Sequence, residues 1–248
     1  MDPREYDLMY SVEDRHWWYQ GMEVITRALL EGRVITSSTR LKILDAGCGT
    51  GAAMTTYLAD FGEVTGVDLF SEALGFCRKR GATRIVRASV ADLPLVSASF
   101  DLVTSFDVLY VRAVASDYAA MNEFARVLKP LGKVLLRLPA YDWLRGRHDE
   151  RVHTVRRYTK KRISDLLKRS GFVVEHVSYA NTFLFPIAVA KRLGDRIFQS
   201  VETQSDLSIN VDRYNKVLRT ILSSESSLVS GPGMPFGLSI YVVGRKRD

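Results

Sequence analysis

The sequence predicts an α/β protein, a three-layer sandwich in which helices cover both faces of a mostly parallel sheet. Short apolar runs alternate with helical segments of about ten residues or more, which is typical of right-handed strand–helix–strand units. A cluster of glycines directly follows the first apolar run. The composition is that of an ordinary folded protein, with 46% hydrophobic and 25% charged residues among 248.

The elements follow in order from the spacing of apolar residues. An amphipathic helix is expected over residues 12–30, because apolar side chains recur there at helical spacing from Trp17 to Leu29. Seven strands are then expected, at Leu41–Ala46, Glu63–Val67, Arg84–Ala88, Phe100–Phe106, Lys133–Leu138, Phe172–Tyr179 and Gly237–Gly244. Helices are expected between them at 52–61, 71–80, 116–128, 159–170, 183–198 and 211–222.

Composition also indicates the compartment. No run of about 18 apolar residues suggests a membrane-spanning helix, and the N-terminus lacks the apolar core of a signal peptide. Cys48 and Cys77 are too few for a disulfide framework and lack metal-ligand spacing, so we expect free thiols and no metal site. The sequence therefore predicts a cytoplasmic protein.

The formal charge of +7 is concentrated in one segment. Residues 145–169 hold ten Lys and Arg against three acids, an excess equal to that of the whole chain. Such a segment is either a solvated helix face or a surface for an anionic partner. The sequence leaves both interpretations open.

The stretch Ile43–Gly51, "ILDAGCGTG", is the most informative motif. In an open parallel sheet, ligands bind beyond the carboxyl ends of the strands, beside the first strand-to-helix turn. Glycines there let a ligand approach the main chain closely, which favours a nucleotide-type ligand. Gly47-x-Gly49-x-x-Ala52 also fits the loose dinucleotide pattern, and Asp68 stands where either class places a ribose-binding carboxylate.

Three further features separate these classes. Asp45 directly precedes the glycines, and the segments "ADLPLVSASFDLV" at 91–103 and "EFARVLKPLGKVLL" at 123–136 accompany it. As a set, these motifs resemble class I S-adenosylmethionine-dependent methyltransferases from about Leu41 to Pro139. The opening "EDRHWWYQGMEVI" looks like a small-molecule subgroup in which a Trp-rich first helix packs across the cofactor.

The resemblance implies a Rossmann-like, seven-stranded sheet with an antiparallel last strand, within one domain of residues 1–248. Residues 1–40 are expected to cover the cofactor, and 41–139 to form the cofactor-binding half. Residues 140–180 and 236–248 are then the substrate-side half of the sheet. The interval 181–235 is longer than a loop, so we expect it to be a helical cap inserted before the last strand.

The resemblance also implies a set of site residues. Gly47 to Gly51 are expected to contact the methionine part of the cofactor and Asp68 its ribose, while Ser89 stands where the family commonly has an acid. The residues expected to bind the cofactor are Asp45, Gly47, Cys48, Gly49, Gly51, Asp68, Leu69, Ser89, Val90, Phe106, Trp18 and Tyr19. Those expected to bind the substrate are His16, Trp17, Tyr110, Phe183 and Phe185.

Methyl transfer from a sulfonium is an in-line displacement, so it depends mainly on alignment and the exclusion of water. A base is needed only if the acceptor must lose a proton. The candidates are His153 and Tyr110, followed by His148 and His16. An obvious catalytic dyad is therefore not expected.

Three functions compete at this stage. The first is a methyltransferase acting on an O, N or activated C atom of a small, hydrophobic or aromatic metabolite. The second is an RNA or DNA methyltransferase that uses the basic segment, although the Asn/Asp-Pro-Pro-aromatic signature of some such enzymes is absent at Ser105–Val108. The third is a nicotinamide-dependent oxidoreductase or a nucleotide-binding module on the same sheet. The sequence does not decide between a monomer and a homodimer.

Overall fold

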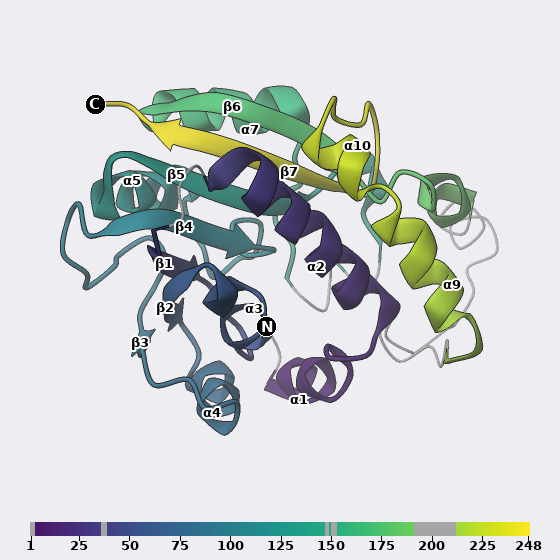
Figure 1. The fold of residues 1–248 in the computed structure, drawn as a ribbon, viewed down its shortest axis with the longest axis horizontal. Helices are drawn as coiled ribbons and strands as arrows, with labels where there is room; N and C mark the ends of the chain where they lie inside the picture. Colours follow the sequence, from purple (N-terminus) through teal and green to yellow (C-terminus); the bar gives the residue numbers. More distant parts are fainter. Residues whose placement is uncertain (1–2, 36–38, 147–148, 150–152, 191–211) are drawn as a thin grey trace.

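The computed structural model of the protein describes residues 3–35, 39–146, 149, 153–190 and 212–248. One seven-stranded sheet forms its centre, in the order β3-β2-β1-β4-β5-β7-β6 (Figure 1). The strands are β1 (Leu41–Ala46), β2 (Gly62–Asp68), β3 (Ile85–Arg87), β4 (Phe100–Phe106), β5 (Leu128–Pro139), β6 (Phe172–Ala180) and β7 (Ser239–Lys246). The last strand, β7, runs antiparallel to both neighbours while the other pairs are parallel, as the sequence predicted.

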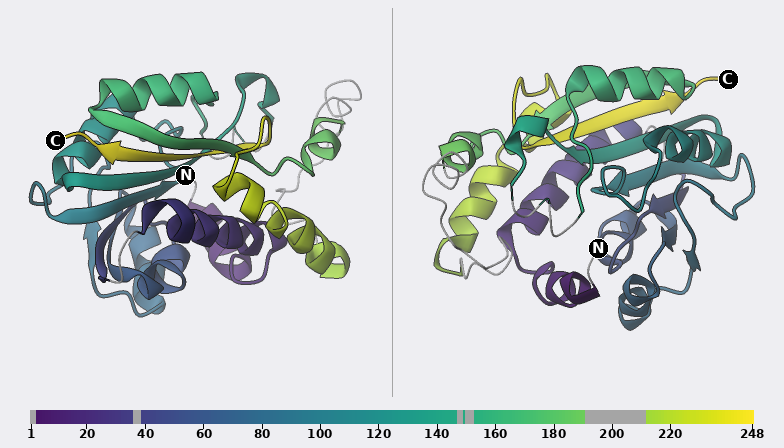
Figure 2. Two further views of the ribbon diagram at one scale, coloured as in Figure 1. Left: turned by 45° about the horizontal axis from the view of Figure 1, so that its top comes forward. Right: turned by 180° about the vertical axis from the view of Figure 1, so that it is seen from behind.

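Helices cover both faces of this sheet. The α-helices are α1 (Pro3–Val12), α2 (Trp17–Leu29), α3 (Ala52–Thr55), α4 (Ser71–Lys79), α5 (Asp117–Val127), α7 (Lys160–Arg169), α9 (Asp212–Ser223) and α10 (Ser226–Ser230). Shorter helical turns are η1 (Leu30–Val34), η2 (Leu58–Asp60) and η3 (Asp142–Leu144). Helix α2 crosses one face, and α5 and α7 lie on the opposite face (Figure 2). The three-layer sandwich is confirmed.

The core lies where the central strands are covered on both sides. Ile43 and Leu44 of β1 and Leu102 and Val103 of β4 have no exposed surface. Continuous apolar strands of this kind are typical of parallel sheets buried on both faces. Because β1, β2, β4 and β5 are parallel, their carboxyl ends meet at one edge, and this edge carries the candidate site.

Helix α2 confirms the amphipathic helix expected near the N-terminus. Met22, Ile25 and Leu29 are fully buried against the sheet. Within the same interface, the hydroxyl groups of Thr26 and Tyr241 on β7 lie 2.8 Å apart. The helix begins at Trp17 because the His16 side chain accepts a hydrogen bond from the Trp18 amide.

Several boundaries differ from the sequence-based prediction. The helix expected over 52–61 is instead the short α3 followed by the 3₁₀ turn η2. The hydroxyls of Thr55 and Thr56 donate to the carbonyls of Gly51 and Ala52, and such hydroxyl bonds compete with regular helix continuation. Helix α1 was not predicted, and its Tyr6 packs on Phe70 beside α4.

The segment before β7 contributes helices that pack against the N-terminal part of the chain. Asn215 of α9 accepts a hydrogen bond from the Trp17 amide at 2.6 Å, and Leu222 packs directly against Gly21. Figure 1 shows α9 alongside α2. Residues 185–190 are helical, and the remainder of the helix expected at 183–198 lies outside the described residues. Within the described part of the chain, no helix is both long and apolar enough to cross a membrane.

Candidate active site

The turn after β1 is built from glycines with left-handed backbone. Gly47 and Gly51 both have φ of 83°. A Cβ atom at Gly47 would lie 2.2 Å from Cγ2 of Val108, so a side chain at this position clashes with its neighbour. The amides of Gly47 and Cys48 donate to the Val67 carbonyl at 2.7 and 2.9 Å, which fixes the turn against β2. The turn therefore exposes main chain rather than side chains to a ligand.

Asp68, the last residue of β2, lies beside this turn. Its Oδ2 accepts a hydrogen bond from the Gly49 amide and its Oδ1 one from the Phe70 amide, both at 3.0 Å. Burial raises the pKa of Asp68, while the two amide donors lower it. A carboxylate has about four acceptor positions. Asp68 thus keeps lone pairs for the hydroxyl groups of a ligand.

Asp45 is buried beneath the glycine turn. Thr104 of β4 donates a hydrogen bond from Oγ1 to Asp45 Oδ1 at 2.8 Å. Burial raises the pKa of Asp45 to about 6, and the Thr104 hydrogen bond acts in the opposite direction. The site thus holds a carboxylate that costs free energy to ionise.

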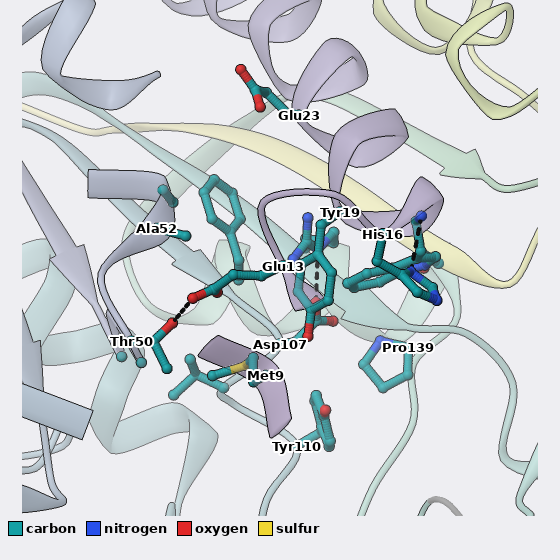
Figure 3. Close-up of a pocket in the computed structure, with 18 of the residues that line it drawn as sticks. Met9, Glu13, His16, Tyr19, Glu23, Thr50, Ala52, Asp107, Tyr110 and Pro139 are labelled. Atoms are coloured by element: carbon teal, nitrogen blue, oxygen red, sulfur yellow. Dashed lines mark hydrogen bonds and ion pairs between the residues drawn. The ribbon is translucent and has the colours of Figure 1, made fainter. Parts of the chain in front are cut away.

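Glu13, between α1 and α2, is a site residue that the sequence analysis did not select. Its buried carboxylate accepts a hydrogen bond from the Thr50 hydroxyl (Figure 3). It also accepts one from Nη2 of Arg80 at 2.8 Å. Burial raises the pKa of Glu13. The contact ties the N-terminal segment to the glycine turn. The available signal was an acid in "EDRHWW", directly before the predicted Trp-rich helix.

Aromatic side chains at the start of α2 form the opposite wall. Trp18 and Tyr19 pack edge to face with ring centroids 5.0 Å apart. The Trp18 ring also lies 4.8 Å from the guanidinium carbon of Arg137 on β5. Figure 3 shows Tyr19 and His16 around the same cavity as Glu13 and Thr50. The first turn of α2 therefore faces the glycine turn across the cavity.

The end of β4 supplies a third group of side chains. Phe106 ends the strand, and Asp107 follows with a left-handed φ of 60°. Asp107 Oδ2 accepts a hydrogen bond from Nε of Arg137 at 2.7 Å. Tyr110 is buried, and burial raises the pKa of its phenol well above the usual range. Arg137 is a second residue that the sequence analysis missed, although it is the one cation in the apolar run "VLLRLP".

These groups surround one cavity of about 1380 Å³. A pocket for a single drug-sized ligand has about 300–1,000 Å³, so there is room for a cofactor and an acceptor together. The predicted site residues that line the cavity are Asp45, Gly47, Cys48, Gly49, Asp68, Leu69, Ser89, Val90, Phe106, Trp18, Tyr19, His16, Trp17 and Tyr110. The structure thus brings together most of the residues that the sequence analysis selected.

Other predicted residues lie elsewhere. Gly51 shapes the turn but is not among the lining residues. His153 does not line the cavity and its side chain is exposed. Phe183 is 47% exposed, and Phe185 packs against Phe236 with centroids 5.4 Å apart, also outside the cavity. Their neighbours Leu184, Ile187 and Ala188 line it instead. His148 lies outside the described residues.

The strand order and the glycine turn place the protein in the class I methyltransferase fold. Residues 44–136 match the family model described as a methyltransferase domain. Residues 44–136 thus form a domain of the S-adenosylmethionine-dependent methyltransferase family.

Two curated relatives and one solved structure illustrate the similarity. Malonyl-[acyl-carrier protein] O-methyltransferase of Enterobacter lignolyticus is 33% identical over 147 residues, which is 55% of this chain and 57% of that protein. Fatty-acid O-methyltransferase of Mycolicibacterium smegmatis is 31% identical over 108 residues, 41% of this chain and 39% of that protein. The chain thus matches only about half of the length of such relatives.

Among solved structures, phosphoethanolamine N-methyltransferase 2 of Haemonchus contortus, in complex with S-adenosyl-L-methionine, is 21% identical with a TM-score of 0.58. The alignment covers 93% of this chain and 53% of that one. At this identity the similarity concerns the fold, and it extends beyond residues 44–136 to nearly the whole chain.

Proposed function

We propose that this protein transfers a methyl group from S-adenosylmethionine to an O, N or activated C atom of a small, hydrophobic or aromatic metabolite. The observation that carries the proposal is the single cavity in which the glycine turn and Asp68 face the aromatic side chains of α2 and β4. Such a cavity holds a nucleoside cofactor on one wall and an apolar acceptor on the other.

The residues of the cofactor wall fit the cofactor. The bare main chain at Gly47 and Gly49 admits the methionine part, and the open lone pairs of Asp68 match the two ribose hydroxyls. Leu69, Ser89 and Val90 line the cavity beyond Asp68, where the adenine would lie. When bound, S-adenosylmethionine would supply a methyl group on a positively charged sulfur. The lone pair of the acceptor would attack the methyl carbon in line with the carbon–sulfur bond, and the sulfur would leave as a neutral thioether.

The aromatic residues contribute alignment and exclusion of water. Trp18, Tyr19 and Phe106 line the cavity, and aromatic rings attract cationic groups. Alignment of two reactants in a closed site accounts for much of the acceleration of a displacement reaction. We therefore assign these three side chains to the region around the reacting methyl group.

Proton transfer has a small part in this proposal. The raised pKa of Tyr110 keeps its phenol protonated near neutral pH, so we assign it to positioning the acceptor rather than to removing a proton. The exposed side chain of His153 lies away from the cavity lining. An acceptor whose attacking atom is already unprotonated suits such a site.

The acceptor wall favours a hydrophobic molecule. Leu184, Ile187 and Leu218 line it together with Trp17. The names of the two relatives give a malonyl group on a carrier protein and a fatty acid as substrates of those enzymes. We therefore place acyl compounds first among the acceptors to be tried, with His16, Trp17 and Tyr110 as their contacts.

The proposal is tested by incubating the protein with S-adenosylmethionine and a panel of acyl and aromatic metabolites. Mass spectrometry should show a gain of one methylene in one class of acceptor, together with S-adenosylhomocysteine. Asp68→Ala should form less product at cofactor concentrations that only just saturate the wild type. Stabilisation by NAD(H) but not by S-adenosylhomocysteine in a thermal shift assay would contradict the proposal, because a ligand that binds the folded protein raises its melting temperature.

The nucleic-acid alternative gains no support from the basic segment. Arg157 and Arg156 pair with Asp149 and Asp117, and Lys161 pairs with Asp165. Several of its described charges thus serve contacts within the chain, and of these three pairs only Lys161–Asp165 lies on a solvated face of helix α7. Methyl label accepted by RNA or DNA would restore this alternative.

A further inference from the structure

Arg137 is a buried cation in the wall of the cavity. It is the only charged residue among Val134–Pro139 of β5, and its side chain is 10% exposed. Burying a charge costs several kcal/mol unless partners compensate it. A guanidinium at this position therefore needs either a full set of protein partners or a ligand.

Protein groups satisfy only part of this guanidinium. Nε donates to Asp107, and the Tyr241 hydroxyl lies within hydrogen-bonding contact. The rings of Trp18 and Phe106 lie 4.8 and 5.2 Å from the guanidinium carbon. A guanidinium has five N–H donors, so donors remain after these contacts.

Arg157 shows what a fully paired arginine looks like in the same cavity wall. Its Nε and Nη2 donate to the two oxygens of Asp149 at 3.0 and 2.9 Å, and its Nη1 donates to the Ala140 carbonyl at 2.8 Å. Arg157 thus has a bidentate carboxylate partner, whereas the described contacts give Arg137 a single bond to Asp107. The two residues are similarly buried but differ in the donors left for a ligand.

We propose that Arg137 binds a carboxylate group within the cavity. The planar guanidinium matches a carboxylate in a bidentate manner, and the flanking rings of Trp18 and Phe106 restrict its orientation. A carboxylate also offsets the positive charge that accumulates when a sulfonium enters beside Arg137. The inference rests on the proposed function, which supplies two sources of this group: the methionine end of the cofactor and an acidic acceptor.

Two pairs of ligands distinguish the sources by calorimetry. S-Adenosylhomocysteine carries the amino-acid carboxylate and 5′-methylthioadenosine lacks it. Dodecanoate and dodecan-1-ol, measured with S-adenosylhomocysteine present, differ in the same group on the acceptor side. In the double variant Arg137→Gln/Asp107→Asn, one of the two carboxylate ligands should bind at least tenfold more weakly than it binds the wild type. The dissociation constant of its counterpart without the carboxylate should change by less than twofold.

Two single variants make the assignment specific. Asp107→Asn alone should keep or increase the affinity for the carboxylate ligand, since Arg137 remains. Arg137→Lys keeps the charge but loses the planar guanidinium, so we expect the affinity for the carboxylate ligand to fall at least threefold. This single variant tests the inference if the double variant does not fold.

The inference would be overturned if, in folded variants, the ratio of the dissociation constants within each ligand pair stayed the same as in the wild type. Failure of the wild type to bind S-adenosylhomocysteine would instead overturn the proposed function, and the dodecanoate pair would still test Arg137.

Discussion

The two walls of the cavity are built in different ways. The wall proposed for the cofactor consists of short continuous segments at the ends of β1 and β2, where the main chain and two aspartates, Asp45 and Asp68, line the cavity. The acceptor wall combines side chains from α2, β5, residues 184–188 and α9. The first wall depends on local backbone geometry and the second on long-range packing. We therefore expect substitutions in the two walls to affect the stability and the activity of the protein in different ways.

The largest effect is expected at the buried Arg157–Asp149 ion pair, which also lines the cavity. Arg157→Gln leaves Asp149 buried without its counterion, and breaking such a pair costs about 3–5 kcal/mol. Urea denaturation should show this loss in the free energy of unfolding. The exposed pair Lys161–Asp165 on α7 is the control, and Lys161→Ala should leave the denaturation midpoint unchanged. Equal midpoints for the two variants would contradict this assignment.

Gly47→Ala probes the cofactor wall. Left-handed backbone costs a residue with a Cβ about 1–2 kcal/mol, and the contact with Val108 adds about 1–3 kcal/mol. The total loss of about 2–5 kcal/mol should appear in the same denaturation assay. Gly75 is a matched control, because it lies in helix α4 and a Cβ atom added there meets nothing within 4 Å. Gly75→Ala should stabilise by about 0.5–1 kcal/mol. A loss below 1 kcal/mol at Gly47 would show that the turn is adaptable.

Asp45 should make the free energy of unfolding of the protein depend on pH. Its folded-state pKa of about 6 lies above the ordinary value of 3.8, so the native state binds the proton more tightly than the unfolded state. Stability attributable to Asp45 therefore falls as the pH rises from about 4 to about 6, and the penalty is complete at pH 7. Asp45→Asn should stabilise the ligand-free protein by about 1–3 kcal/mol at pH 7 and have no effect near pH 4. An equal effect of Asp45→Asn at both pH values would show that the ionisation of Asp45 is not the source of the stabilisation.

The smallest effect is expected from a pair of substitutions in the acceptor wall. Leu184 lines the cavity whereas its neighbour Phe185 packs outside it on Phe236. Once an acceptor is found, Leu184→Ala should raise its KM about threefold to tenfold, because about 0.7–1.4 kcal/mol of apolar contact is lost. Phe185→Ala should leave KM within twofold. The reverse result would return Phe185 to the role that the sequence predicted.

Sequence reasoning predicted the cofactor wall better than the acceptor wall for a physical reason. The end of the first strand, Asp45 and the glycines lie within nine residues, Ile43–Gly51, so their spacing alone defines the turn. The run "FLFPIAVA" at 183–190, by contrast, is apolar on every side. Its periodicity cannot show whether Leu184 or Phe185 faces the ligand.

Contacts between distant residues explain the remaining omissions. Glu13 meets Arg80 from 67 positions away, and Arg137 meets Asp107 from 30 positions away. A single sequence gives the charges but not these pairings. The division of the helix expected at 52–61 also depends on hydroxyl bonds from Thr55 and Thr56 that helix periodicity does not reveal.

The binding of S-adenosylhomocysteine to the wild type and to Asp68→Ala, measured by calorimetry, tests the central claim most directly. Hydrogen bonds to a charged group contribute about 1.5–3 kcal/mol each, so the substitution should weaken binding at least tenfold. Leu184→Ala, on the acceptor wall, should leave this Kd unchanged. An unchanged Kd in a folded Asp68→Ala variant would contradict the placement of the cofactor between Asp68 and the glycine turn.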